Sequence, residues 1–189
     1  EAEYNTGGGS DTSTDDDEGI FEDLSWGDLL IIGIALLLII LAIYMWSMGS
    51  PINSWMDMRV GMILFGVGML HAWVAAQYGS LGTGDLSDDW AQGIGTAGLL
   101  VMTAGLWIWA NSGSNMGDRA IRYALSGLVL ILLALPETLV EVFGADDDVF
   151  MDVMWEFPAY IVIQTFASAV GVALLISSAV GIFTSGGDE

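Results

Sequence analysis

The sequence predicts an all-α integral membrane protein, a bundle of five transmembrane helices with its N-terminus outside and its C-terminus inside. Two observations predict this class. The chain has 189 residues, of which 54% are hydrophobic, and its mean hydropathy is +0.63. The apolar residues gather in five long runs separated by polar breaks. One soluble core of this size cannot bury so much apolar surface, whereas a lipid bilayer accommodates it.

The first 28 residues predict a solvated acidic tail on the outer side, because glycine, serine and aspartate dominate them. Residues 29–46 predict the first span. They carry no charge, and at 1.5 Å per residue they extend roughly 27 Å, close to the thickness of the hydrocarbon layer. Ser25 and Asp28 have the spacing of a capping box and predict the start of this helix.

Four further apolar runs follow, separated by segments rich in glycine, serine, asparagine or aspartate. The predicted spans are residues 60–78, 90–110, 120–143 and 158–183. Pro158 suits the first turn of the last helix, where its missing N–H is harmless. Residues 29–185 therefore form one predicted bundle, and residues 186–189 form a short inner tail. A four-span bundle, in which one run packs without crossing, is the alternative.

The three arginines predict the orientation. Arg59 lies beside the loop between the first two spans, and Arg119 and Arg122 lie beside the loop between the third and fourth. With five spans these loops share one side, which the positive-inside rule assigns to the cytoplasm or to the interior of a virion. The N-terminal tail then lies outside. Its lack of an initiator methionine fits either a removed signal peptide or a trimmed chain.

The charge composition restricts the partners and indicates the environment. The chain has 24 acidic residues against three arginines and no lysine, a formal net charge of −21. Nucleic acid and anionic lipid headgroups both require clustered cations, so this imbalance argues against them as direct partners. An excess of carboxylates without lysine is typical of extreme halophiles, because molar salt screens the self-repulsion. The expected location is the cell membrane of a halophilic archaeon or the membrane of its virus.

Small residues predict where the helices pack, since lipid provides no hydrophobic drive for helices to associate. The pairs Gly93/Ala97 and Ala167/Gly171 have the four-residue spacing that lets two backbones approach closely. The first span is bulky on nearly every side, which suits a helix at the edge of the bundle with much lipid contact.

His71, the single histidine, falls in the middle of the second span. An ionisable group at that depth is expected to face protein rather than lipid. Gln164 in the fifth span and Gln77 at the outer end of the second are its candidate polar partners, and the sequence leaves open whether they meet His71. Two interpretations stay open: a neutral packing histidine, and a proton-linked or ligand-binding group.

Glu137 and Glu141 form a second candidate site. Glu137 lies roughly 25 Å along the fourth predicted helix, near the outer boundary of the hydrocarbon, and Glu141 lies one turn further on the same face. Two such carboxylates could hold a cation at a pore mouth, or could be ordinary charges at headgroup level. At the inner end of this helix, Asp118 and Arg122 are four residues apart and predict an ion pair.

The chain lacks the residues and motifs that the common kinds of catalytic, metal and nucleotide sites require. Without cysteine or lysine, the chain offers no thiolate metal site and no Schiff base. No hydrolase, zinc-protease or Walker motif is present. The string GIGTAG at residues 93–98 matches a dinucleotide fingerprint in letters only, because it opens an apolar helix rather than following a strand. We therefore expect no catalytic residue, no metal ligand and no cofactor.

In composition and topology the whole chain resembles the multi-span membrane proteins of haloarchaea and of their pleomorphic, lipid-enveloped viruses. The resemblance assigns no role to individual residues. The expected function is that of a structural or assembly subunit, which organises lipid and other membrane proteins, or copies of itself, in a membrane complex or viral envelope. The alternative is a small channel or transporter using His71, Gln164 and Glu137, whose mark is a set of polar groups converging on one interior line.

Overall fold

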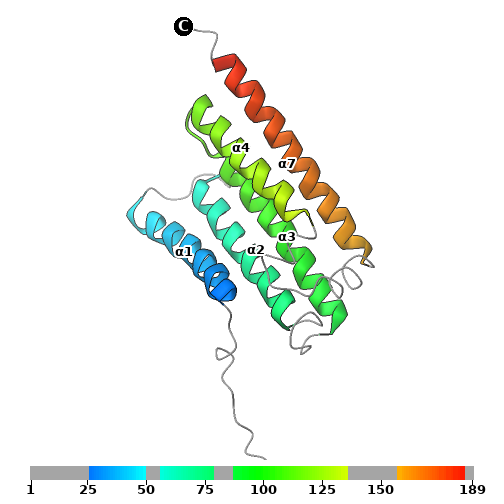
Figure 1. Cartoon of the computed structure of the whole chain (residues 1–189). Helices are drawn as coiled ribbons and strands as arrows, with labels where there is room; N and C mark the ends of the chain where they lie inside the picture. The colour runs from blue at the N-terminus through cyan, green and yellow to red at the C-terminus, as the bar shows by residue number, and fades with distance from the viewer. Residues whose placement is uncertain (1–25, 50–55, 79–86, 136–156, 186–189) are drawn as a thin grey trace, which may run out of the picture.

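The computed structural model describes residues 26–49, 56–78, 87–135 and 157–185, and all regular secondary structure in these ranges is helical (Figure 1). Five helices are present there. Four of them, α1, α2, α3 and α7, are long and apolar enough to cross a membrane. The helices are α1 (Trp26–Met48), α2 (Met58–Tyr78), α3 (Asp88–Asn111), α4 (Met116–Leu133) and α7 (Pro158–Ser185).

Four of the predicted spans lie inside observed helices, and the fourth differs at its start. The prediction began this span at residue 120, whereas α4 begins at Met116. The side chain of Asn115 accepts a hydrogen bond from the Asp118 backbone N–H at 2.8 Å and so caps the helix one turn earlier. The C-cap is Ala134, close before Pro136, whose ring disfavours a helical conformation at the preceding residue. Residues 136–143 of the predicted span lie outside the described residues.

Each described helix runs antiparallel to the described helix before it, and the two lie side by side (Figure 1). Helix α1 packs on α2, α2 packs on α3, and α3 contacts both α4 and α7, which also pack on each other. Among the described helices α1 contacts α2 alone, in agreement with its predicted place at the edge. We call the end with the first residues of α1, α3 and α7 the Asp28 end. The opposite end, where α2 and α4 begin, is the Arg122 end.

Glycines bring the backbones of α2 and α3 into direct contact. A Cβ atom added to Gly68 would lie 2.7 Å from the Gly98 carbonyl oxygen, and one added to Gly61 would lie 2.8 Å from that of Gly105. No real Cβ fits at such distances, so these positions require glycine. Without a hydrophobic drive between helices in lipid, this close packing is a main source of their association.

The packing face of α3 differs from the sequence prediction. Gly93 and Ala97 are exposed, and a Cβ added to Gly93 would meet nothing within 4 Å. The face that contacts α2 passes through Gly98 and Gly105 instead. Each residue turns the helix by about 100°, so Gly93 and Gly98, five residues apart, point in different directions. The four-residue spacing recurs along several stripes of this glycine-rich helix, so spacing alone does not select the stripe.

The second predicted packing pair lies at the contact between α4 and α7. Ala167 is fully buried. A Cβ added to Gly171 would lie 3.0 Å from the Gly127 carbonyl oxygen, and one added to Gly127 would lie 2.7 Å from that of Gly171. These two glycines are the equivalent, on the other side of α3, of the glycine contacts between α2 and α3.

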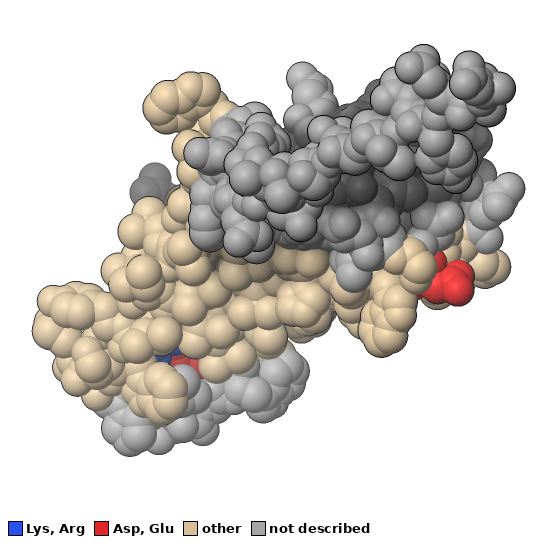
Figure 2. All heavy atoms as spheres, turned by 90° about the horizontal axis from the view of Figure 1, so that it is seen from below, with Lys and Arg blue, Asp and Glu red and all other residues tan. Residues whose placement is uncertain are grey.

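Two buried apolar clusters fill the bundle. One lies toward the Asp28 end and includes Trp73 of α2, Leu99 of α3 and Tyr160 of α7. The other lies between α3, α4 and α7 and includes Leu106 and Leu130. Charged side chains occupy only small areas of the described surface in the view of Figure 2, from below Figure 1. The described part of the chain is compatible with a membrane protein.

Candidate functional site

Asp28, in the first turn of α1, is a buried carboxylic acid in contact with α2. Only 6% of the residue is exposed. Its Oδ1 atom accepts a hydrogen bond from Trp73 Nε1 at 2.9 Å and another from Gln77 Nε2 at 2.8 Å. Trp73 and Gln77 are four residues apart, so they lie on the same face of α2. These three side chains form the candidate site, which we call the Asp28 cluster.

The Asp28 cluster fastens the edge helix to the bundle. A buried carboxyl group is costly unless hydrogen bonds replace those it made to water, and bonds to a charged acceptor are stronger than neutral ones. Both donors here are neutral and lie on α2, the one described helix that α1 contacts. Below the cluster, the buried face of α1 carries only Ile31, Ala35 and Ala42. Asp28 therefore supplies the main polar contact between α1 and α2 within the described chain.

Sequence reasoning missed Asp28 because it assigned this residue to a capping box with Ser25, which lies outside the described residues. Gln77 was a candidate partner of His71, and in the structure it donates to Asp28. A signal was present in the sequence. Trp73 and Gln77 share one face, and an antiparallel hairpin places the start of α1 level with the end of α2.

His71 lies on the surface of the bundle rather than in its interior. The residue is exposed, and its Nδ1 atom lies 2.8 Å from the Val67 carbonyl oxygen in the preceding turn. The contact faces of α2 explain this placement. Gly66 lies against α1, whereas Gly68 and Ala72 lie against α3. His71 lies at the edge of the α3 contact, with its Cβ beside Gly98, and its ring bonds its own helix at Val67.

Gln164 of α7 completes the end of α4. Its Nε2 donates to the Ala134 carbonyl oxygen at 2.6 Å, and Ala134 is the C-cap of α4. The last carbonyls of a helix have no partner within the helix, so the Gln164 amide satisfies one of them. Ser168 in turn donates to the Gln164 carbonyl oxygen at 3.0 Å.

The polar side chains singled out from the sequence are therefore not gathered in one place. In the described chain His71 bonds its own helix, Gln77 bonds α1 and Gln164 bonds the end of α4. Glu137 and Glu141 lie outside the described residues. Within the described ranges no three histidine, aspartate or glutamate side chains are grouped so that they could hold a metal ion.

The Arg122 end has its own polar network. Arg122 donates from Nε to Asp118 at 2.9 Å, which is the predicted ion pair, and from Nη1 to Ser112 Oγ at 2.9 Å. Its guanidinium also lies over the Trp109 ring, 5.2 Å from the ring centroid, in cation–π geometry. The network fixes the turn between α3 and α4.

A second ion pair lies at the start of α2. Arg59 Nη2 lies 2.6 Å from Asp57 Oδ2, and Arg59 Nε donates to Oδ1 at 2.8 Å. The hydrogen bonds from Arg59 hold the pKa of Asp57 below its usual value. All three arginines thus lie near the start of α2 or of α4, at one end of the bundle.

No protein-family model, no curated protein and no solved structure matches this chain. The function must therefore be argued from the arrangement of the helices and their side chains.

Proposed function

We propose that this protein is a structural or assembly subunit of a membrane complex or viral envelope in a halophilic archaeal system, where it organises lipid and partner proteins. One observation carries the proposal. Among the described residues, Asp28 and Gln77 join two helices, Gln164 bonds the end of α4 and His71 bonds its own helix, and these polar side chains do not line a common path. A transport pathway needs polar groups converging on one interior line.

Two features of the packing support this proposal. Glycine contacts join α2 to α3 and α4 to α7 without space between the backbones. Helix α1 leaves large apolar side chains uncovered along most of its length, which suits contact with lipid or with neighbouring membrane proteins. The partners we propose are membrane lipid, other membrane proteins and further copies of this chain, with no nucleic acid and no catalytic role.

The proposed topology has five crossings, with the Asp28 end outside and the Arg122 end inside. The arginines support it, because all three lie near one end and positive charge marks the inner side. Helix α4 is less apolar than the other four, yet its 18 residues extend roughly 27 Å, enough for one crossing. The expected location is a cell membrane or a virion membrane.

A small channel or transporter is the second candidate, and the Asp28 cluster is the observation that favours it. A buried acid within a span is a common element of ion pathways. Its partners, however, are an indole and an amide that tie two helices together. The structural or assembly role is therefore the better supported of the two functions.

The experiment that tests the proposal is extraction in mild detergent and molar salt, followed by native sizing and identification of the proteins that travel with the chain. The expected result is a stoichiometric assembly. A lone chain or small oligomer that conducts ions in liposomes would overturn it. Flux that disappears in Asp28→Asn and persists in Asp89→Asn, a change to an exposed acid of α3, would establish the second candidate.

A further inference from the structure

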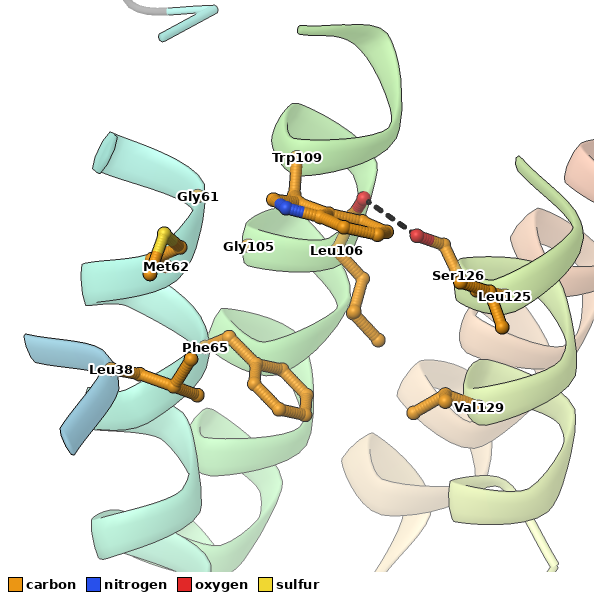
Figure 3. A pocket seen from close by; sticks show the side chains of 10 residues that line it. All are labelled: Leu38, Gly61, Met62, Phe65, Gly105, Leu106, Trp109, Leu125, Ser126 and Val129. Carbon is orange, nitrogen blue, oxygen red and sulfur yellow. Dashed lines mark hydrogen bonds between the residues drawn. The ribbon is translucent and has the colours of Figure 1, made fainter. Parts of the chain in front are cut away.

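An apolar groove lies between α1 and α4, over the surface of the α2–α3 pair (Figure 3). Its volume is about 310 Å³. Leu38 of α1 forms one wall and Leu125 and Val129 of α4 form the other, while Phe65 and Leu106 form part of the floor. Since α1 and α4 do not contact each other in the described chain, the groove opens between them toward the surrounding membrane.

The lining selects hydrocarbon over water. Ser126 is the one lining residue with a polar side chain other than Trp109, and its hydroxyl already donates to the Leu106 carbonyl oxygen at 3.3 Å (Figure 3). A buried water needs two to four polar partners, which this lining does not offer. In a bilayer, an apolar groove that opens to the side meets the hydrocarbon chains of lipids.

The groove has the reach of one leaflet. Trp109, near the end of α3, lines it at the Arg122 end, and Leu38 lines it ten residues before the end of α1. Ten residues of helix extend about 15 Å, half of a hydrocarbon layer of roughly 30 Å. The groove therefore passes from the level of the headgroups to the middle of the bilayer.

Among the described residues, its headgroup end carries a small excess of positive charge, although the chain as a whole is acidic. Trp109, which lines the groove, is covered by the Arg122 guanidinium. Arg122 uses Nε and Nη1 for Asp118 and Ser112, and its Nη2 makes no hydrogen bond with any described residue. Three arginines and two aspartates lie among the described residues of this end. A phosphate is a strong acceptor for a guanidinium donor.

We propose that this groove binds one hydrocarbon chain of an anionic membrane phospholipid, whose phosphate accepts a hydrogen bond from Arg122 Nη2. The site gives the proposed organisation of lipid a definite location, and it rests on that proposal because it requires the helices to lie in a bilayer. The bound chain fills the space between α1 and α4 and so becomes part of the packing of the bundle.

The experiment measures lipid bound per chain after purification in detergent and molar salt, removal of lipid, and titration with phosphatidylglycerol or phosphatidylcholine of identical chains. Val129→Trp fills the groove from α4, and Leu128→Trp is its matched control, because Leu128 is exposed on the next position. Leu38→Trp fills it from α1, with the exposed neighbour changed in Leu37→Trp as control. Circular dichroism checks that each variant folds.

The expected result is one retained phosphatidylglycerol per wild-type chain, loss of it in both groove variants and retention in both controls. Wild type should bind phosphatidylglycerol roughly fivefold more tightly than phosphatidylcholine, the size expected for one arginine near an anionic lipid surface. Arg122→Gln should abolish this preference. Arg119→Gln, which changes an arginine bonded to the Gly113 carbonyl at the same end, should retain it.

Equal lipid retention by groove variants and controls would overturn the site, and equal affinity for the two lipids would overturn the role of Arg122. A lipid-free wild-type oligomer that Val129→Trp dissociates would show that a second copy occupies the groove instead. Failure of the proposed assembly function is seen separately, as a lone chain on native sizing whose lipid binding is unchanged.

Discussion

Helices α1 and α3 are nearly equal in length, at 23 and 24 residues, yet they pack in opposite ways. The most apolar window of α1 is more hydrophobic than that of α3, but only 17% of it is buried against 50% for α3. In a soluble protein the more apolar helix would be the more buried one. In lipid, apolarity decides whether a helix crosses, and small residues decide whether it packs.

The largest expected effect comes from disrupting the contact between α2 and α3. Gly68→Leu should destabilise the bundle by about 3 kcal/mol or more, because its first side-chain atom already overlaps the backbone of α3. Reversible unfolding in mixed micelles would measure the change. Gly93→Leu is the matched control on an exposed position and should stay within about 0.5 kcal/mol of wild type. Equal losses in the two variants would show that Gly68 does not form the contact.

The next effect concerns the attachment of α1. Asp28→Ala should cost about 1–3 kcal/mol, because the buried Trp73 N–H and the partly buried Gln77 amide lose this acceptor. Hydrogen exchange should accelerate in the first turns of α1 and remain unchanged at the contact between α4 and α7. Asp89→Ala, at an exposed acid in the first turn of α3, should leave exchange in α1 at the wild-type rate.

A smaller effect is expected where α7 completes α4. Gln164→Leu should destabilise the end of α4 by about 1 kcal/mol, since the Ala134 carbonyl loses its donor. Exchange at the last turn of α4 would report it. Ser177→Ala removes a hydroxyl that bonds only its own helix, at the Ala173 carbonyl, and should have no such effect. If hydrogen exchange in the last turn of α4 also accelerates in Ser177→Ala, the effect comes from a general loosening of α7 and not from the Gln164 hydrogen bond.

The smallest effect is the pH dependence of the Asp57–Arg59 pair. The pKa of Asp57 is lowered in the folded protein from its ordinary value of 3.8. The pair therefore contributes stability above about pH 4, and this contribution is lost as the pH falls through the lower folded pKa. The stability difference between wild type and Asp57→Asn should be constant at neutral pH and shrink in acid. A difference that grows in acid would contradict the assignment.

The sequence predicted the five helices that the described residues contain, and the approximate limits of four of them, because long uncharged runs and polar breaks are local signals. It also predicted the edge position of α1 and the Asp118–Arg122 ion pair. It did not select the packing stripe of α3, since glycines recur on several sides of that helix. It could not find the Asp28 cluster from local spacing, because Trp73 lies 45 residues from Asp28 and the link depends on how two helices align.

Helices α1 and α3 differ in how many of their positions require a particular residue. Four positions of α1, including Asp28 and Ala35, are buried. The remaining positions require little more than an apolar side chain. In α2 and α3 the glycines at the contact carry the specification, because no other residue fits them. Over evolution, most positions of α1 should therefore accept other apolar residues, whereas the glycines at the contact between α2 and α3 should be retained.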